Sequence, residues 1–146
     1  MPSRCFVYIL LHMVVVGTAG AADPITKTSI QFDGVYIGTP FPGDEAYCHY
    51  LRFYPKGSVI TVSSVCDQSS LADIKKWFNF KKSGPKNSGI SRGRAKIDDN
   101  KISFSAVSRE GAVSYRGEIE NGYIHLKSYS HINKHRGQDS YTFLKW

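Results

Sequence analysis

The chain has few cysteines, and they do not form a redox or hydrolase motif. Its 146 residues contain three cysteines, and no two of them form a Cys-x-x-Cys pair. The sequence therefore gives no sign of a redox centre or an activated thiol. The Gly-x-Ser-x-Gly motif is also absent, and most carboxylates lie in turn sequences such as Asp98-Asp99. We expect a protein that is not an enzyme.

Long apolar runs are missing after the N-terminus. Arg4 precedes the apolar run FVYILLHMVVVG, and Ala19 to Ala21 follow it at the spacing of a cleavage site. The run is too short for a typical transmembrane helix, and no second run follows. We expect residues 1–22 to be a cleavable signal peptide and residues 23–146 to form a single secreted or periplasmic domain.

Acidic residues are outnumbered by basic ones. The chain has 19 Lys and Arg against 12 Asp and Glu, which gives a net charge of +7. The stretch 75–96 contains no acidic residue at all. It is either a solvated basic face or a site for a polyanion or an acidic protein. The candidate anion-binding residues are Lys75, Lys76, Lys81, Lys82, Arg92 and Arg94. No RNA-binding, helix-turn-helix or zinc-finger motif is present, so we expect no specific nucleic-acid partner.

Most of the chain after Phe32 shows the two-residue alternation of β-strands, broken by turn residues. The expected strands are 34–38, 46–54, 58–66, 90–97, 101–108, 112–119, 123–132 and 140–146. Pro55-Lys56-Gly57 predicts a tight hairpin in which Gly57 takes a positive φ. Eight short antiparallel strands predict an all-β, up-and-down meander. We expect it to close into a barrel, because closure removes the exposed edges; an open curved sheet is the alternative.

One segment, 70–80, has helical periodicity and lies between the third and fourth expected strands. Ser70 and Asp73 have the spacing of a capping box. The apolar stripe consists of Leu71, Ile74, Trp77 and Phe78. Burial of these aromatic side chains against the barrel stabilises the fold more than a solvated stacking platform would. We therefore expect them to seat the helix, not to bind nucleic acid.

Two segments carry a family resemblance. YLRFYPKGSVITVSS (50–64) and NGYIHLKSYSHIN…GQDSYTFLKW (121–146) are similar to a group of small, uncharacterised exported bacterial proteins with a lipocalin-like outline. Their hairpin reads close to Y-L-R-F-Y-P-D-G-T-V-I. Gly34-Val35-Tyr36 resembles the lipocalin G-x-W start with Tyr in place of Trp, whereas Arg136 precedes the last expected strand and does not end it. The resemblance implies a barrel and brings no characterised activity.

Cys48 and Cys66 remain after the signal peptide, and an oxidising compartment favours a disulfide between them. If Tyr54 pairs with Ser58 in the hairpin, Cys48 lies opposite Ser64. Cys66 is then a diagonal neighbour on the same face, which is slightly too far for a relaxed bridge without a bulge or a looser loop. Two buried free thiols are the alternative.

The histidines do not have metal-site spacing. His125 and His131 alternate with Ile and Leu on one expected strand, so we expect them to face solvent and to bind no metal. No cofactor is expected.

A barrel of eight strands is either filled by its side chains or holds one small ligand. We expect an exported binding protein for a small apolar or amphipathic ligand. The candidate lining residues are Tyr47, His49, Leu51, Phe53, Phe104, Tyr115 and Phe143. The alternative is a filled barrel that acts as a surface-interaction protein through its basic stretch.

The first prediction concerns processing. We expect the exported chain to begin at Ala22 or Asp23, because either start fits a small-x-small cleavage site. N-terminal sequencing of exported material checks this. A mature chain that retains Met1 would contradict it.

Overall fold

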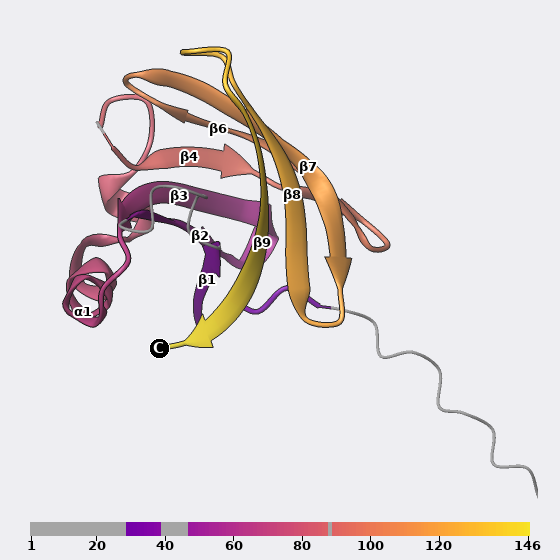
Figure 1. Ribbon diagram of the computed structural model, residues 1–146, viewed down its shortest axis with the longest axis horizontal. Coiled ribbons are helices and arrows are strands. Elements are labelled where there is room, and N and C mark those ends of the chain that lie inside the picture. The colour runs from indigo at the N-terminus through magenta and orange to yellow at the C-terminus, as the bar shows by residue number, and fades with distance from the viewer. Residues whose placement is uncertain (1–28, 39–46, 88) are drawn as a thin grey trace, which may run out of the picture.

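The computed structural model describes residues 29–38, 47–87 and 89–146 (Figure 1). The expected signal peptide lies outside the described residues. The strands are β1 (Gly34–Gly38), β2 (Tyr47–Phe53), β3 (Ser58–Val65), β4 (Ser91–Arg94), β5 (Lys96–Asp98), β6 (Lys101–Ser108), β7 (Gly111–Glu120), β8 (Tyr123–Ser130) and β9 (Arg136–Lys145). The helical elements are α1 (Gln68–Trp77) and two 3-10 turns, η1 (Pro55–Gly57) and η2 (Phe80–Lys82). None of the described helices is long and apolar enough to cross a bilayer.

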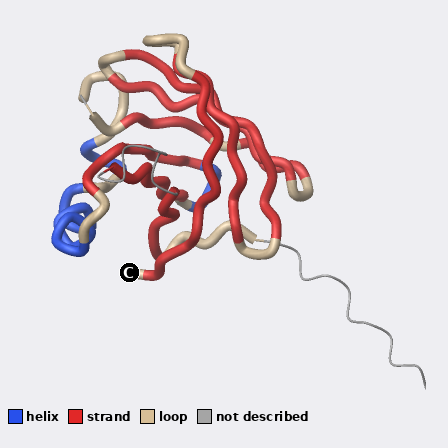
Figure 2. The backbone as a smooth tube through the Cα atoms, in the orientation of Figure 1, coloured by secondary structure: helices blue, strands red, loops and turns tan. Residues whose placement is uncertain are grey.

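The strands form one closed antiparallel barrel. β1 pairs with both β2 and β9, and β4 pairs with both β3 and β6. β4 and β5 are two parts of one strand interrupted at Ala95, whose N–H donates to the Gly57 carbonyl at 2.7 Å. The barrel therefore has eight strands, and the predicted meander and its closure are confirmed. Figure 2 shows the strands wrapped around one interior, with the helix outside.

Closure depends on close backbone contact at Gly93. This residue pairs with Val59 of β3 and with Ala106 of β6. A Cβ at this position would overlap the carbonyl oxygen of Ser105. A residue without a side chain is therefore required where β4 passes between its two neighbours.

Two elements begin two or more residues before their predicted starts. The helix begins at Gln68, where the Asp67 carbonyl accepts the first bond from the N–H of Leu71 at 3.1 Å. The predicted cap at Ser70 is therefore wrong, because Ser70 lies within the helix. The last strand begins at Arg136, four residues before the predicted start, because it pairs with Tyr129.

The barrel strands are buried on two faces where α1 covers them. Inside the barrel, the apolar cluster contains Tyr36, Leu51, Phe53, Val59, Ile102, Phe104, Tyr115, Ile119, Ile124, Leu126 and Tyr141. A second cluster lies between α1 and the outer face, and it contains Val35, Cys48, Tyr50, Ile60, Val62, Ile74, Phe78 and Ile90. Alternation along β2 and β3 supplies both clusters from the same strands.

The predicted apolar stripe seats the helix, although its aromatics are not equally buried. Ile74 and Phe78 are 1% and 0% exposed, while Trp77 is only half-buried at the edge of the contact. The guanidinium of Arg52 donates to the Phe78 carbonyl at 3.1 Å and lies over the Trp146 ring. Arg52 thus ties the end of the helix to β2.

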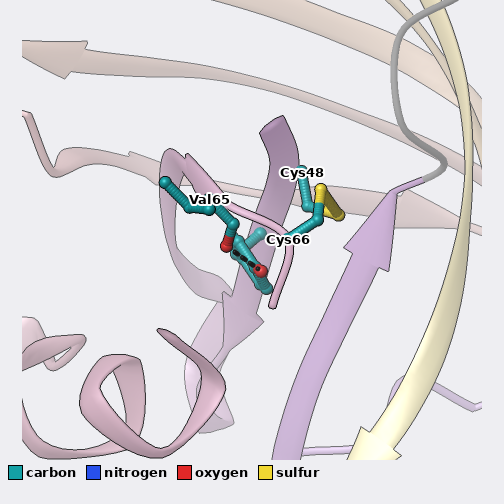
Figure 3. The surroundings of a disulfide bond; sticks show 4 residues. Cys48, Val65 and Cys66 are labelled. Carbon is teal, nitrogen blue, oxygen red and sulfur yellow. Dashed lines mark hydrogen bonds between the residues drawn. A yellow bond between two sulfur atoms is a disulfide. The ribbon is translucent and has the colours of Figure 1, made fainter. Parts of the chain in front are cut away.

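The Cys48–Cys66 disulfide is present (Figure 3). The hairpin has the predicted register, with Cys48 opposite Ser64, and Gly57 has a φ of 84°. Cys66 follows the last paired residue, Val65. Because it is free of the ladder, its Cα approaches that of Cys48 to 5.0 Å. The bulge or looser loop that we considered necessary is therefore not needed.

The helix seat gives a second prediction. Phe78→Ala should lower the free energy of unfolding by about 3–5 kcal/mol, because a fully buried aromatic is lost and a cavity is left. Trp77→Ala should cost less, and Lys75→Ala, on the exposed face, should cost almost nothing. Urea unfolding of the three variants measures this order. Equal losses for Phe78→Ala and Lys75→Ala would show that the helix contributes little to stability.

Candidate functional site

One end of the barrel interior is a polar cavity. It has a volume of about 480 Å³ and is open to solvent. Its walls are lined by Thr61, Val62, Ser63, Gly89, Ser91, Ser108, Glu110, Val113, Ser128, Ser130, Asn133 and His135, together with His49, Tyr115 and Asp139. It lies at the end that carries the β6–β7 turn and the β8–β9 loop, at the top of Figure 1.

The cavity arises because inward positions change from apolar to hydroxyl residues along several strands. On β3 the inward series runs from Val59 to Thr61 and Ser63. On β8 it runs from Leu126 to Ser128 and Ser130. Short hydroxyl side chains leave space that leucine or phenylalanine would fill. One end of the barrel is therefore packed, and the other is hollow and polar.

A network of four side chains forms the inner end of the cavity. His49 Nδ1 lies 2.6 Å from the Tyr141 hydroxyl, and His49 Nε2 lies 3.3 Å from the Tyr115 hydroxyl. The Tyr141 hydroxyl donates to Asp139 Oδ2 at 3.5 Å. These groups come from β2, β7 and β9, so closure of the barrel is what brings them together.

The acceptor at one end of the network sets the order of its donors. An ionised Asp139 can only accept, so Tyr141 uses its single proton on that carboxylate. Tyr141 then accepts from His49, which assigns the proton of the neutral imidazole to Nδ1. Nε2 remains as an acceptor for the Tyr115 hydroxyl. Each of the four groups has a partner in this arrangement.

Burial keeps His49 and the two tyrosines of this network uncharged at neutral pH. Desolvation lowers the pKa of His49 to about 4, although part of the residue faces the open cavity. Desolvation also raises the pKa of Tyr115 to about 12, and it raises the pKa of Tyr141 well above its usual value. The pKa of Asp139 is raised as well, chiefly by desolvation. The cavity thus offers neutral donors and acceptors beside the carboxyl group of Asp139, a buried residue.

The cavity is acidic although the chain as a whole is basic. Glu110 and Asp139 line it, and no Lys or Arg does so among the described residues. Ser108 donates to Glu110 at 2.9 Å, and this bond lowers the pKa of the glutamate. His135 is the nearby basic group, and its electrostatic effect offsets part of the desolvation that raises the pKa of Asp139. Such a site repels anions and accepts neutral or cationic groups.

The predicted ligand-lining residues occupy different positions. His49 and Tyr115 line the cavity. Leu51, Phe53 and Phe104 are buried in the packed half of the barrel, and Phe143 packs against them. Tyr47 is 46% exposed. The structure therefore brings together two of the seven, and it adds the hydroxyl residues and Asp139, which the sequence interpretation did not include.

The predicted anion-binding residues are also divided. Lys75, Lys81, Lys82 and Arg94 are exposed, and Lys76 pairs with Asp73 at 3.1 Å. The guanidinium of Arg92 donates to Ser83 Oγ at 3.0 Å and to the carbonyls of Phe80 and Ser83 at 2.7 and 2.6 Å. It also lies over the Phe80 ring at 4.0 Å. Arg92 holds the loop around η2 and does not face solvent as its strand position predicted.

Metal binding has no support among the residues that the structure describes, where no three His, Cys, Asp or Glu side chains converge. His125 and His131 are exposed, as their alternation predicted, and each makes a hydrogen bond to a serine hydroxyl.

Comparison of the chain with protein-family models, curated proteins and solved structures finds no match. The lipocalin-like resemblance is therefore supported only in its outline, as a closed eight-stranded antiparallel barrel. Tyr36, in the position of the lipocalin tryptophan, is buried and contacts Phe53 and Phe143. Arg136 lies over Tyr129 at 4.9 Å, while Tyr36 pairs with Phe143 seven residues further along β9. Arg136 does not close the barrel over Tyr36.

The network gives a third prediction, on pH. As the pH falls below about 6.5, the unfolded chain protonates at His49 while the folded imidazole, with its pKa of about 4, does not. The folded state should therefore lose about 2–3 kcal/mol from this residue between pH 6.5 and 4. His49→Gln keeps a donor and an acceptor but cannot protonate. Urea unfolding at pH 7 and pH 4.5 should show a smaller loss in this variant, and parallel losses would contradict the assignment.

Proposed function

We propose that this protein is a small-molecule-binding barrel whose ligand occupies the polar cavity. The observation that carries the proposal is a solvent-open cavity of about 480 Å³ whose inner end is the network of His49, Tyr115, Tyr141 and Asp139. The volume is within the range of small-molecule sites, and a few convergent polar groups are what such sites use to orient a ligand. No chemical step is proposed.

The lining favours a polar ligand over the apolar one expected from the sequence. The apolar interior residues pack against one another, with Phe53, Phe104 and Tyr115 in successive aromatic contacts. The open part of the interior presents hydroxyl groups, which both donate and accept. A ligand with several hydroxyl or amine groups satisfies these partners, whereas an alkyl chain would leave them unpaired.

The charge of the cavity restricts the chemical class of the ligand further. Glu110 and Asp139 disfavour a carboxylate or phosphate group at this position. A neutral polyol or a cationic amine is therefore the class that fits best. An amine can pair with Asp139, and a polyol can hydrogen-bond to the serine-rich walls.

The alternative function, polyanion binding by the stretch 75–96, has less support. Arg92 is bound to carbonyls of its own chain, and Lys76 is paired with Asp73. Five cations of the candidate set are exposed, and among the described residues four of them form no ion pair: Lys75, Lys81, Lys82 and Arg94.

We place this function outside the reducing cytosol. The Cys48–Cys66 disulfide supports that location, because disulfides persist in oxidising compartments.

The fourth prediction tests the cavity. Native mass spectrometry of protein purified from its own host should show a bound small polar compound. Ser91→Leu places a larger apolar side chain in the cavity and should abolish binding, so the mass increase from the bound compound (the adduct) should disappear. Ser105→Leu makes the same change on the outer face of β6, where the serine is exposed, and should retain it.

Asp139→Asn separates the two ligand classes. It should weaken the binding of an amine by about tenfold or more, since a charge-assisted contact is lost. The affinity for a neutral polyol should change much less. A fatty acid as the bound compound, or an adduct that survives Ser91→Leu, would contradict the proposed site.

A further inference from the structure

A groove on the outer face of the barrel carries a row of cations that no described carboxylate neutralises. The groove has a volume of about 720 Å³ and crosses β5 to β9. Its floor is the backbone of the cross-strand row Ile102, Gly117 and Leu126, since the side chains of Ile102 and Leu126 lie inside the barrel. A Cβ at Gly117 would overlap the carbonyl of His125, so this glycine permits the close backbone approach at the centre of the floor.

Strand register places a charged row on each side of this floor. On one side the opposed residues are Lys96, Ser103, Arg116, Lys127 and Gln138. On the other side they are Asp98, Lys101, Glu118 and His125. In the second row, Lys101 lies opposite both carboxylates, Asp98 and Glu118. The first row contains three cations and no acid.

The basic row brings two like charges together. Arg116 and Lys127 are direct cross-strand partners, and like charges in such positions destabilise a sheet. Glu118 is two residues from Arg116 on the same strand, yet among the described residues neither Arg116, Lys127 nor Lys96 lies within 4.0 Å of a carboxylate oxygen. An anion between these cations would relieve the repulsion.

We propose that this groove, defined by Lys96, Arg116 and Lys127 with Ser103 and Gln138, binds a ligand that carries two or more phosphate or sulfate groups. Arg116 and Lys127 hold one oxyanion, since neighbouring strands are about 5 Å apart. Lys96 lies two strands from Arg116, with Ser103 between them, and contacts the next oxyanion. The guanidinium supplies paired donors, and Ser103 and Gln138 supply neutral ones.

This site is separate from the polar cavity and from the basic stretch. Arg116 and Lys127 point outward, while their sequence neighbours Tyr115 and Ser128 line the cavity inside. Lys96 is the single residue that the groove shares with the stretch 75–96. The two faces take ligands of opposite charge preference.

The test uses tripolyphosphate and a heparin-derived sulfated disaccharide as probes in isothermal titration calorimetry at low and high salt. Wild type should bind at least one probe, with affinity that falls as salt rises. Arg116→Gln with Lys127→Gln should weaken binding by about tenfold or more, since charge-assisted contacts are lost. Lys81→Gln with Lys82→Gln removes the same charge from the basic stretch and should change binding by less than about twofold, because these residues lie outside the groove.

A second readout distinguishes this site from ordinary surface charge. The groove double variant should melt at the same temperature as wild type or higher without ligand, because the like-charge pair is gone. Tripolyphosphate should raise the midpoint temperature of thermal unfolding of the wild type but not that of the variant. The single variant Lys127→Gln changes only one exposed side chain and can be used in the same binding and melting measurements. Ser91→Leu should bind both probes like wild type.

The outcomes divide clearly. Preference for tripolyphosphate assigns a phosphorylated ligand, and preference for the disaccharide assigns a sulfated one. Equal losses in the groove and control variants would show that net charge alone attracts anions and would overturn the proposal. Absence of binding to both probes at low salt would overturn it as well.

Discussion

The pairing of β4 with both β3 and β6 is the contact on which the rest of this structure depends. β4 is only four residues long, and Gly93 lies where both neighbours approach it. Without β4, β3 and the part of β6 that pairs with β4 would be exposed edges of an open sheet. The interior is then a bounded space, in which the size of each inward side chain decides between a packed core and a cavity.

The two ends of the barrel differ in the size of their inward side chains, so one end is packed and the other contains a cavity. Aromatic and branched residues fill one end, and the covered outer face beneath α1 adds a second apolar cluster. These two clusters supply the hydrophobic stabilisation of the fold. The hydroxyl-lined end contributes little of it and contains the buried network of His49, Tyr115, Tyr141 and Asp139. Polar groups at such depth are retained only where their partners are complete.

Local patterns predicted much of this arrangement, and contacts between distant segments account for what they missed. The turn chemistry of Gly57 set the β2–β3 register, and the apolar stripe located the helix. Alternation placed Arg92 outside the barrel, but it could not show that the η2 loop covers that face. Ser63 and Ser128 were not identified from the sequence, because only the closed barrel brings these inward positions together at one end. The start of β9 was missed because Arg136-Gly137-Gln138 has the composition of a loop.

The net charge of the chain does not show which ligands each face of the barrel prefers, because every strand has one face toward the cavity and one toward solvent. Arg116 and Lys127 face the outer groove, while Tyr115 and Ser128, their neighbours in the chain, face the cavity. Two-residue alternation thus separates an acidic interior from a basic exterior along the same strands. Water in the outer groove screens its cations, whereas Asp139 is a buried residue, 6% exposed, and its carboxyl group acts through a medium of lower polarity. We therefore expect the interior charge to be the stronger determinant of which ligand the proposed cavity site binds, although the exterior carries more charges.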